Sequence, residues 1–201
     1  MAGRLIAIEG LDGVGKTTLS RDLAKHLGAR WLTTPGLALR DVRTVVDTVF
    51  ADAPIAAQLF YASTVVAAGE QARRHLDAGQ DVIMDRYWLS TVVYARARGS
   101  WLELPEVAAT LQQPSLTLVV DLVESARRER LFERGASALD LETLTPARSQ
   151  LLRSTYTTAA ARLGSPWARL DLTGLSRGEA VLAALEVIEW HEGAARGARW
   201  H

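Results

Sequence analysis

Residues 10–17 combine glycines, a lysine and a threonine in an order that suits phosphate binding. The segment reads Gly-Leu-Asp-Gly-Val-Gly-Lys-Thr, with the spacing G-x-x-x-x-G-K-[ST], and it lies between the apolar stretch Leu5–Ile8 and a segment of helical periodicity. Glycines let backbone N–H groups converge on phosphate oxygens, and the start of a helix adds positive potential. We therefore expect Lys16 to reach the β- and γ-phosphates of ATP and the Thr17 hydroxyl to bind Mg²⁺. The expected ATP contacts come from Gly10, Gly13, Val14, Gly15, Lys16, Thr17 and Thr18.

The glycine spacing argues against two other interpretations of this segment. The glycines at 10, 13 and 15 are spaced G-x-x-G-x-G, whereas a dinucleotide-binding fold needs G-x-G-x-x-G, so nicotinamide chemistry is excluded. A plain turn with incidental glycines is disfavoured because the residue order and the neighbouring elements agree.

A second polar site follows the apolar stretch Asp81–Met84. Asp85 and Arg86 come at its carboxyl end, where open parallel sheets have their ligand crevice. We expect Asp85 to hold Mg²⁺ through water and Arg86 to face the phosphate that is transferred or accepted. The alternative makes Asp85 a helix N-cap and Arg86 its surface neighbour, and the phosphate-binding segment weighs against it.

Residues 124–135 concentrate four arginines. On a helix Arg127, Arg130 and Arg134 share one side, where they could close over the phosphates of ATP. The alternative is a solvated helix with weak pairs such as Glu124 with Arg128. We favour function for Arg130 or Arg134 because they adjoin Gly135–Thr145, a charged, loop-like segment, and we predict a lid over about residues 124–145.

Short apolar runs alternate with segments of helical periodicity along the chain, which predicts an α/β fold with a parallel sheet. The predicted strands are Leu5–Ile8, Arg30–Thr33, Asp81–Met84, Leu116–Val120 and Trp167–Leu170. The predicted helices are Lys16–Leu27, two within Leu37–Ala78, Trp88–Ala97, Pro105–Gln112, Glu124–Phe132, Ala147–Leu163 and a last one from Arg177 to about Glu189. Together with the phosphate-binding segment they indicate a three-layer P-loop NTPase fold with five parallel strands. No linker divides residues 1–201, so we expect one domain, with a flexible tail at 193–201.

The composition narrows the class of protein further. The chain has 201 residues, 23 Lys and Arg against 23 Asp and Glu, and no cysteine, which excludes thiolate chemistry and long-range attraction of nucleic acid. Only Lys16 and Lys25 are lysines, so the lysine of the phosphate-binding segment stands out in an arginine-rich chain. We see neither a signal peptide nor a membrane-spanning stretch and expect a cytoplasmic protein that binds no nucleic acid or membrane.

These residues resemble the thymidylate kinase family in order and spacing. The resemblance rests on residues 8–18, on Gln-Leu-Phe-Tyr-Ala at 58–62, on Asp-Arg-Tyr-Trp-Leu-Ser-Thr at 85–91, on the arginine-rich lid and on residues 151–156. It spans nearly the whole chain, and it implies that γ-phosphoryl passes from Mg-ATP to a nucleoside monophosphate, with a deoxypyrimidine nucleotide such as dTMP as the favoured acceptor.

The resemblance also implies roles for single residues. Asp12 would approach the acceptor sugar, Tyr94 would lie against the deoxyribose, and Phe60 would stack on the acceptor base; an aromatic of the core is the alternative for Phe60 and Tyr94. Arg86 would hold the acceptor phosphate, with Ser90 nearby. Because position 13 is glycine, the chain resembles the subgroup that takes its catalytic arginine from the lid, which points again to Arg130 and Arg134.

Acceptor-side motifs depart from the family pattern. Thr64 stands where family members carry an arginine that helps to hold the base, and Thr33-Thr34-Pro35-Gly36-Leu37 lacks the arginine and second glycine of Thr-Arg-Glu-Pro-Gly-Gly. Arg40 or Arg43 could supply the missing phosphate contact. The lid's expected Asp-Arg pair is replaced by Asp140-Leu141.

These departures keep two alternatives open. One is a kinase of the same fold that phosphorylates a nucleoside or a small specialised metabolite. The other is a non-catalytic nucleotide-binding protein; a guanine-reading Asn/Thr-Lys-x-Asp motif is missing because both lysines precede residue 26. The family also implies a homodimer, consistent with the apolar helix around Ile55–Val66, although core packing would explain that helix equally well.

Overall fold

A five-stranded parallel sheet forms the centre of the computed structural model, which describes residues 2–136 and 138–197. The strand order is β2-β3-β1-β4-β5, as expected for strands joined by helical crossovers. The strands are β1 (Leu5–Gly10), β2 (Arg30–Thr33), β3 (Val82–Asp85), β4 (Leu116–Asp121) and β5 (Trp167–Asp171). The predicted parallel sheet is confirmed, and its carboxyl ends meet at one edge.

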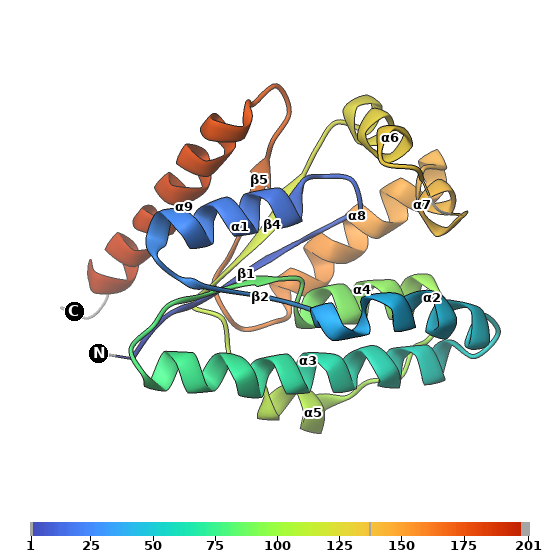
Figure 1. The fold of residues 1–201 in the computed structure, drawn as a ribbon, viewed down its shortest axis with the longest axis horizontal. Coiled ribbons are helices and arrows are strands. Elements are labelled where there is room, and N and C mark those ends of the chain that lie inside the picture. The colour runs from blue at the N-terminus through green and yellow to red at the C-terminus, as the bar shows by residue number, and fades with distance from the viewer. Residues whose placement is uncertain (1, 137, 198–201) are drawn as a thin grey trace.

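Helices cover both faces of this sheet. They are α1 (Lys16–Leu27), α2 (Arg40–Val49), α3 (Pro54–Asp77), α4 (Trp88–Ala97), α5 (Pro105–Thr110), α6 (Glu124–Glu133), α7 (Ala138–Thr143), α8 (Pro146–Ala161) and α9 (Arg177–Gly197), with a 3₁₀ turn at Leu37–Leu39. Figure 1 shows α1 and α9 on one side of the strands and α3, α4 and α8 on the other. None of the helices in the described ranges is both long and apolar enough to cross a membrane.

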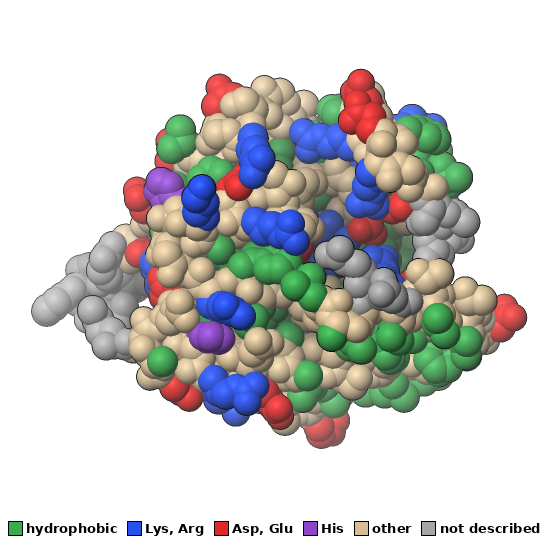
Figure 2. All heavy atoms as spheres, in the orientation of Figure 1, with side chains coloured by type: hydrophobic (Ala, Val, Ile, Leu, Met, Phe, Trp, Pro, Cys, Tyr) green, Lys and Arg blue, Asp and Glu red, His purple; other side chains and the backbone are tan. Residues whose placement is uncertain are grey.

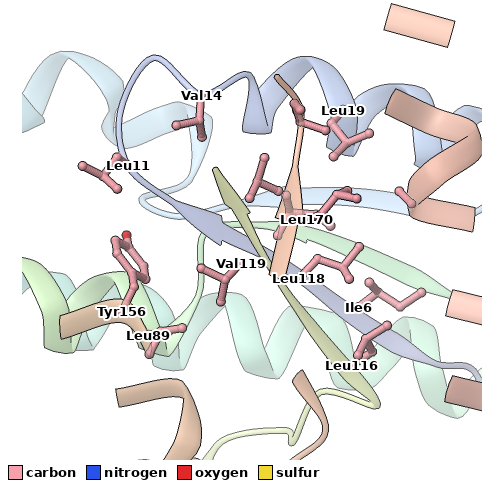
Figure 3. Packing of buried hydrophobic residues seen from close by; sticks show 14 of the residues in the cluster. Ile6, Leu11, Val14, Leu19, Leu89, Leu116, Leu118, Val119, Tyr156 and Leu170 are labelled. Carbon is pink, nitrogen blue, oxygen red and sulfur yellow. The ribbon is translucent and has the colours of Figure 1, made fainter. Parts of the chain in front are cut away.

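Alternation along β1 divides the core between the two faces. Ile6 and Ile8 belong to a cluster with residues of α1 and α9, whereas Leu5 and Ala7 pack among residues of α3. All six residues of β1 are buried, as expected of a central parallel strand. Figure 3 shows how side chains from β1, β4 and β5 meet beneath the phosphate-binding loop.

Two predicted segments differ from the observed ones. The last helix continues to Gly197 instead of ending near Glu189, because alanine favours helix and extending a helix costs less than starting one. Residues 198–201 of the predicted tail lie outside the described part of the chain. The segment Gly135–Thr145 was predicted to be a loop, yet it contains the short helix α7, whose end is packed inward at Thr143 and Leu144.

Candidate active site

The loop between β1 and α1 has the conformation that its glycines predict. Gly10, Gly13 and Gly15 all have positive φ, between 86° and 134°, which side chains other than glycine rarely adopt. A Cβ on Gly10 would lie 2.2 Å from the Val120 carbonyl oxygen, and one on Gly13 would lie 2.7 Å from Leu131 of α6. The backbone therefore passes close to β4 and α6 and leaves its N–H groups for a ligand. Gly13, Gly15, Lys16, Thr17 and Thr18 line a cavity here.

Gly10 and Val14 also belong to the predicted ATP contacts, and their surroundings differ from those of the other five residues. Val14 is fully buried in the core. The carbonyl of Gly10 accepts hydrogen bonds from the Arg86 guanidinium at 3.3 Å and from the Tyr156 hydroxyl at 2.9 Å. Neither Gly10 nor Val14 lines the cavity that the loop forms.

Lys16 lies inside the loop, where its ammonium donates a hydrogen bond to the Leu11 carbonyl. Burial and the nearby Arg86 guanidinium lower the pKa of Lys16, whereas Asp12 and Asp85 raise it, and the net result is a pKa of about 7. An added anion beside the ammonium would favour its charged form. The lysine is therefore placed to bind phosphate and to gain a proton when it does so.

Thr17 and Asp85 bring two oxygen-bearing side chains together in this cavity. The Thr17 hydroxyl donates to one Asp85 carboxylate oxygen at 2.6 Å, while the other, Oδ1, is buried without a hydrogen-bond partner. Hydroxyl and carboxylate oxygens are the ligands that Mg²⁺ prefers, and an unpartnered buried oxygen suits a bound water or ion. These residues fit the expected metal. Asp85 is the last residue of β3 and does not cap α4, whose N-cap is Tyr87.

Arg86 is held over the loop by contacts along its whole length. Its φ of 66° is the one positive value among the described residues other than glycine. Its N–H donates to the Ile8 carbonyl at 3.0 Å, and its own carbonyl accepts from the Thr34 hydroxyl at 2.9 Å. These contacts offset a backbone conformation that costs roughly 1–2 kcal/mol. The guanidinium ion-pairs with Asp12.

Asp12 joins this arginine to Tyr94 of α4, whose hydroxyl donates to the carboxylate at 2.8 Å. Burial alone would raise the pKa of Asp12, but Arg86, Lys16 and Arg43 reverse that effect and hold it well below its usual range. Burial and the Asp12 charge raise the pKa of Tyr94. Asp12 is therefore an anion at neutral pH and already shares its charge with several donors.

A buried glutamate, Glu9, holds the start of α4 next to Arg86. Glu9 of β1 accepts the N–H groups of Tyr87 at 2.9 Å and Ser90 at 3.2 Å, and it also accepts the Ser90 hydroxyl. Burial raises the pKa of Glu9. The Ser90 hydroxyl in turn lies 3.1 Å from Arg86, so the start of α4 and the arginine are positioned together.

Two cavities meet at this arginine. The phosphate cavity is one of them, and the second, which we call the acceptor cavity, lies between α2, α3 and α4. Both are lined by Asp12, Thr34, Pro35, Arg43 and Arg86. Figure 2 shows Lys and Arg side chains gathered around the hollow on this face. Arg43 and Arg86 are the cations among these residues, so a group transferred from one cavity to the other would pass close to both.

The arginines of α6 divide into two sets. Arg130 and Arg134 line the phosphate cavity; Arg130 approaches the Val14 carbonyl at 3.4 Å, and Arg134 ion-pairs with Asp140 of α7 at 2.7 Å. Arg127 was expected on the same side but is fully buried.

Arg127 joins α6 and α7 to the phosphate-binding loop. Its guanidinium donates to the Asp12 carbonyl at 3.1 Å and to the Thr143 carbonyl at 2.7 Å, and it ion-pairs with Glu124. Glu124 therefore pairs with Arg127 and not with Arg128, the partner that its spacing suggests. Arg128 donates instead to the Leu144 carbonyl.

On the acceptor side the structure places some predicted residues and adds others. Tyr94 and Ser90 line the acceptor cavity as expected, whereas Phe60 does not and its neighbour Tyr61 does. Arg40 begins α2, but its side chain lies outside the described part of the structure. Arg43 lines both cavities. The sequence had offered Arg43, with Arg40, as a source of the missing phosphate contact, whereas it gave no signal for Tyr61.

Comparison with known proteins agrees with this geometry. The family model described as Thymidylate kinase matches residues 8–161. A thymidylate kinase of Xylella fastidiosa (strain M23) is 31% identical over 150 residues, which are 70% of this chain and 69% of that protein. A thymidylate kinase of Xanthomonas euvesicatoria pv. vesicatoria (strain 85-10) is 34% identical over 159 residues, covering 70% and 66%. The chain belongs to the thymidylate kinase family.

Solved structures support the same fold. A thymidylate kinase from Candida albicans superposes with a TM-score of 0.70 at 19% identity, covering 95% of this chain and 93% of that one. A deoxyadenosine kinase from M. mycoides superposes with a TM-score of 0.68 at 16% identity, covering 92% and 98%. As a member of the thymidylate kinase family, the chain is a nucleoside monophosphate kinase with the P-loop fold.

Proposed function

We propose that this protein transfers the γ-phosphoryl group of Mg-ATP to dTMP. The observation that carries the proposal is that two cavities meet at Asp12, Thr34, Pro35, Arg43 and Arg86, with Lys16 on the donor side. A phosphate bound on each side would bring donor and acceptor into line. Positioning and charge stabilisation supply most of the catalysis in this type of reaction.

In the proposed reaction an oxygen of the acceptor phosphate forms a bond to the γ-phosphorus, and the bond from that phosphorus to the β–γ bridging oxygen breaks. The electron pair stays on the β-phosphate of ADP. Lys16, Arg86 and Arg130 would stabilise the negative charge that spreads over the transferred group. Arg134 would join them once it leaves Asp140.

Thr17 and Asp85 would hold Mg²⁺. The ion would neutralise charge on the β- and γ-phosphates of the donor.

The site favours an anionic acceptor over an alcohol. A nucleoside hydroxyl needs a general base, and the carboxylate at the junction, Asp12, has a lowered pKa and already accepts from Arg86 and Tyr94. A monophosphate needs no base, and two arginines face the place where its charge would lie. This supports a nucleotide acceptor.

The test is an acceptor panel with purified protein, Mg²⁺ and ATP, in which ADP formation is measured for dTMP, dUMP, other nucleoside monophosphates and nucleosides. We expect dTMP to be the best acceptor. Lys16→Met should lower turnover by roughly 100-fold or more while the fold is retained, because it removes a charge from the transition state. Lys25→Met, on the exposed side of the same helix, is the matched control. Turnover with a nucleoside and none with dTMP would refute the proposal.

We further propose that the protein works as a cytoplasmic homodimer. α2 and the first turns of α3 carry exposed apolar side chains at Val45, Val49, Ile55 and Leu59. In Figure 2 hydrophobic side chains cover the surface over α2 and α3. A second copy of the chain would bury them.

A further inference from the structure

The part of the acceptor cavity that lies beyond the phosphate junction must hold the sugar and base of the proposed acceptor. The phosphate cavity does not reach this part, whose lining includes Gln58, Tyr61, Thr64, Thr91, Ala95 and Arg98. These residues come from α3, from α4 and from the residue that ends α4. The group that distinguishes one base from another is expected among them.

Most polar groups there are already committed to protein partners. The Gln58 amide donates to the Leu102 carbonyl at 3.0 Å and accepts from the Ser100 hydroxyl at 2.5 Å. The Thr64 hydroxyl donates to the Tyr61 carbonyl at 2.7 Å, as serine and threonine often do inside helices. Each of these contacts fixes its side chain to the wall of the cavity, and neither Gln58 nor Thr64 carries a charge.

Arg98 differs because it is charged, and its contacts orient it while leaving several of its donors unused. One terminal nitrogen donates to Asp47 of α2 at 2.9 Å, and the guanidinium carbon lies 5.3 Å from the centre of the Tyr61 ring. Asp47 is itself fixed by the Tyr61 hydroxyl at 2.8 Å and by Arg43 at 3.5 Å. A guanidinium has five N–H donors, so most of those on Arg98 remain for a ligand.

We propose that Arg98 selects the acceptor base by donating hydrogen bonds to the 4-carbonyl of thymine or uracil. This inference rests on the proposed function and names the residue that determines its specificity. An arginine has donors and no acceptor, so it pairs with a carbonyl oxygen and leaves the 4-amino group of cytosine unpaired. A site built to hydrogen-bond one group rejects an analogue that lacks it. The short side chain of Thr64, on the same cavity, leaves space for this contact.

The test compares kcat/KM for dTMP and dCMP in Arg98→Gln and Arg98→Met. A glutamine amide both donates and accepts, so Arg98→Gln should accept the two bases alike. In both variants the ratio of dTMP to dCMP should fall by roughly tenfold or more, through KM for dTMP and with little change in kcat. Arg96→Met is the matched control, because Arg96 ion-pairs with the exposed Glu103 and does not line the acceptor cavity. It should leave the ratio within about twofold.

Further measurements separate this inference from folding and from the proposed function. Thermal unfolding of each variant shows whether the fold is intact, and Asp47 keeps Arg43 and Tyr61 as partners when Arg98 is replaced. Thr64→Arg in the Arg98→Met protein places a guanidinium in the same cavity and should restore the preference for dTMP. A folded Arg98→Gln enzyme with an unchanged ratio would overturn the inference. A wild-type enzyme inactive with dTMP would instead refute the proposed function.

Discussion

We expect Lys16 to gain its positive charge when ATP binds. Its ammonium is buried next to Arg86, and its pKa of about 7 means that a large share of the free protein carries a neutral lysine above neutral pH. The phosphates of ATP would bring several negative charges to the same point. Binding would raise the pKa of Lys16 and draw a proton from solution.

This gives a pH dependence with a defined sign. The lowered pKa belongs to the free protein, so protonation must accompany ATP binding above about pH 7 and not below it. We expect the dissociation constant for Mg-ATP to rise roughly 25-fold from about pH 6.5 to about pH 8.5. Titration calorimetry in buffers of different ionisation enthalpy should detect uptake of close to one proton near pH 8. Lys25→Met should behave like wild type, and the absence of proton uptake would contradict the assigned pKa.

Helix α3 is packed onto the site through a glycine. Gly69 faces Tyr87, the residue after Arg86, and a Cβ at position 69 would lie 2.7 Å from the tyrosine hydroxyl oxygen. The tyrosine ring is buried between α3 and β3, and burial raises the pKa of its hydroxyl to about 12. The neighbouring buried side chains leave the ring little space to move away from an added methyl group.

Gly69→Ala should therefore lower the free energy of unfolding by roughly 1–3 kcal/mol through overpacking, partly offset by the better helix propensity of alanine. Gly193→Ala in α9 is the matched control, because nothing lies within 4 Å of its Cβ position. That control should raise stability by up to about 1 kcal/mol. Urea unfolding of both variants measures the difference, and equal or greater stability of Gly69→Ala would contradict the packing described.

At the level of elements, local chemistry made much of the fold predictable. The strands are apolar runs with polar ends, and α1 and α4 have the bounds that their helical periodicity predicts. Lys16, Thr17, Asp85 and Arg86 were found because one short motif and one strand end carry their chemistry. The helix α3 is apolar around most of its surface, so its periodicity did not show that Tyr61 and not Phe60 lines the cavity.

Contacts between distant segments could not be predicted. Thr34 reaches the Arg86 carbonyl across 52 residues of sequence, and Glu9 reaches Tyr87 across 78. Arg98 and Asp47 come from two helices whose relative placement depends on the whole sheet. The burial of Arg127 could not be predicted either. A charged side chain is rarely buried unless it has several partners, and the partners of Arg127 lie on α7 and in the phosphate-binding loop.

At the level of the whole molecule, α2 links the acceptor cavity to the outer surface. On one side of the helix Arg43 lines the cavity and Asp47 ion-pairs with Arg98, which also lines it. Val45 and Val49 lie on the other side and are 59% and 65% exposed. A partner copy packed on the valines would therefore also hold the two charged residues in place. Dimerisation and acceptor binding should be coupled through this helix.

Val49→Asp tests that coupling, because a carboxylate buried in an apolar interface is strongly unfavourable. We expect wild-type protein at micromolar concentration to have twice the mass of one chain in size-exclusion chromatography with light scattering, and the variant to have the mass of one. The variant should also show a KM for dTMP raised by roughly tenfold, with a smaller change in kcat, since α2 would no longer be held over the cavity. Leu182→Asp on α9, where Leu182 is 58% exposed, is the control and should change neither property. A wild-type monomer, or a monomeric variant with normal KM, would show that α2 keeps its position without a partner.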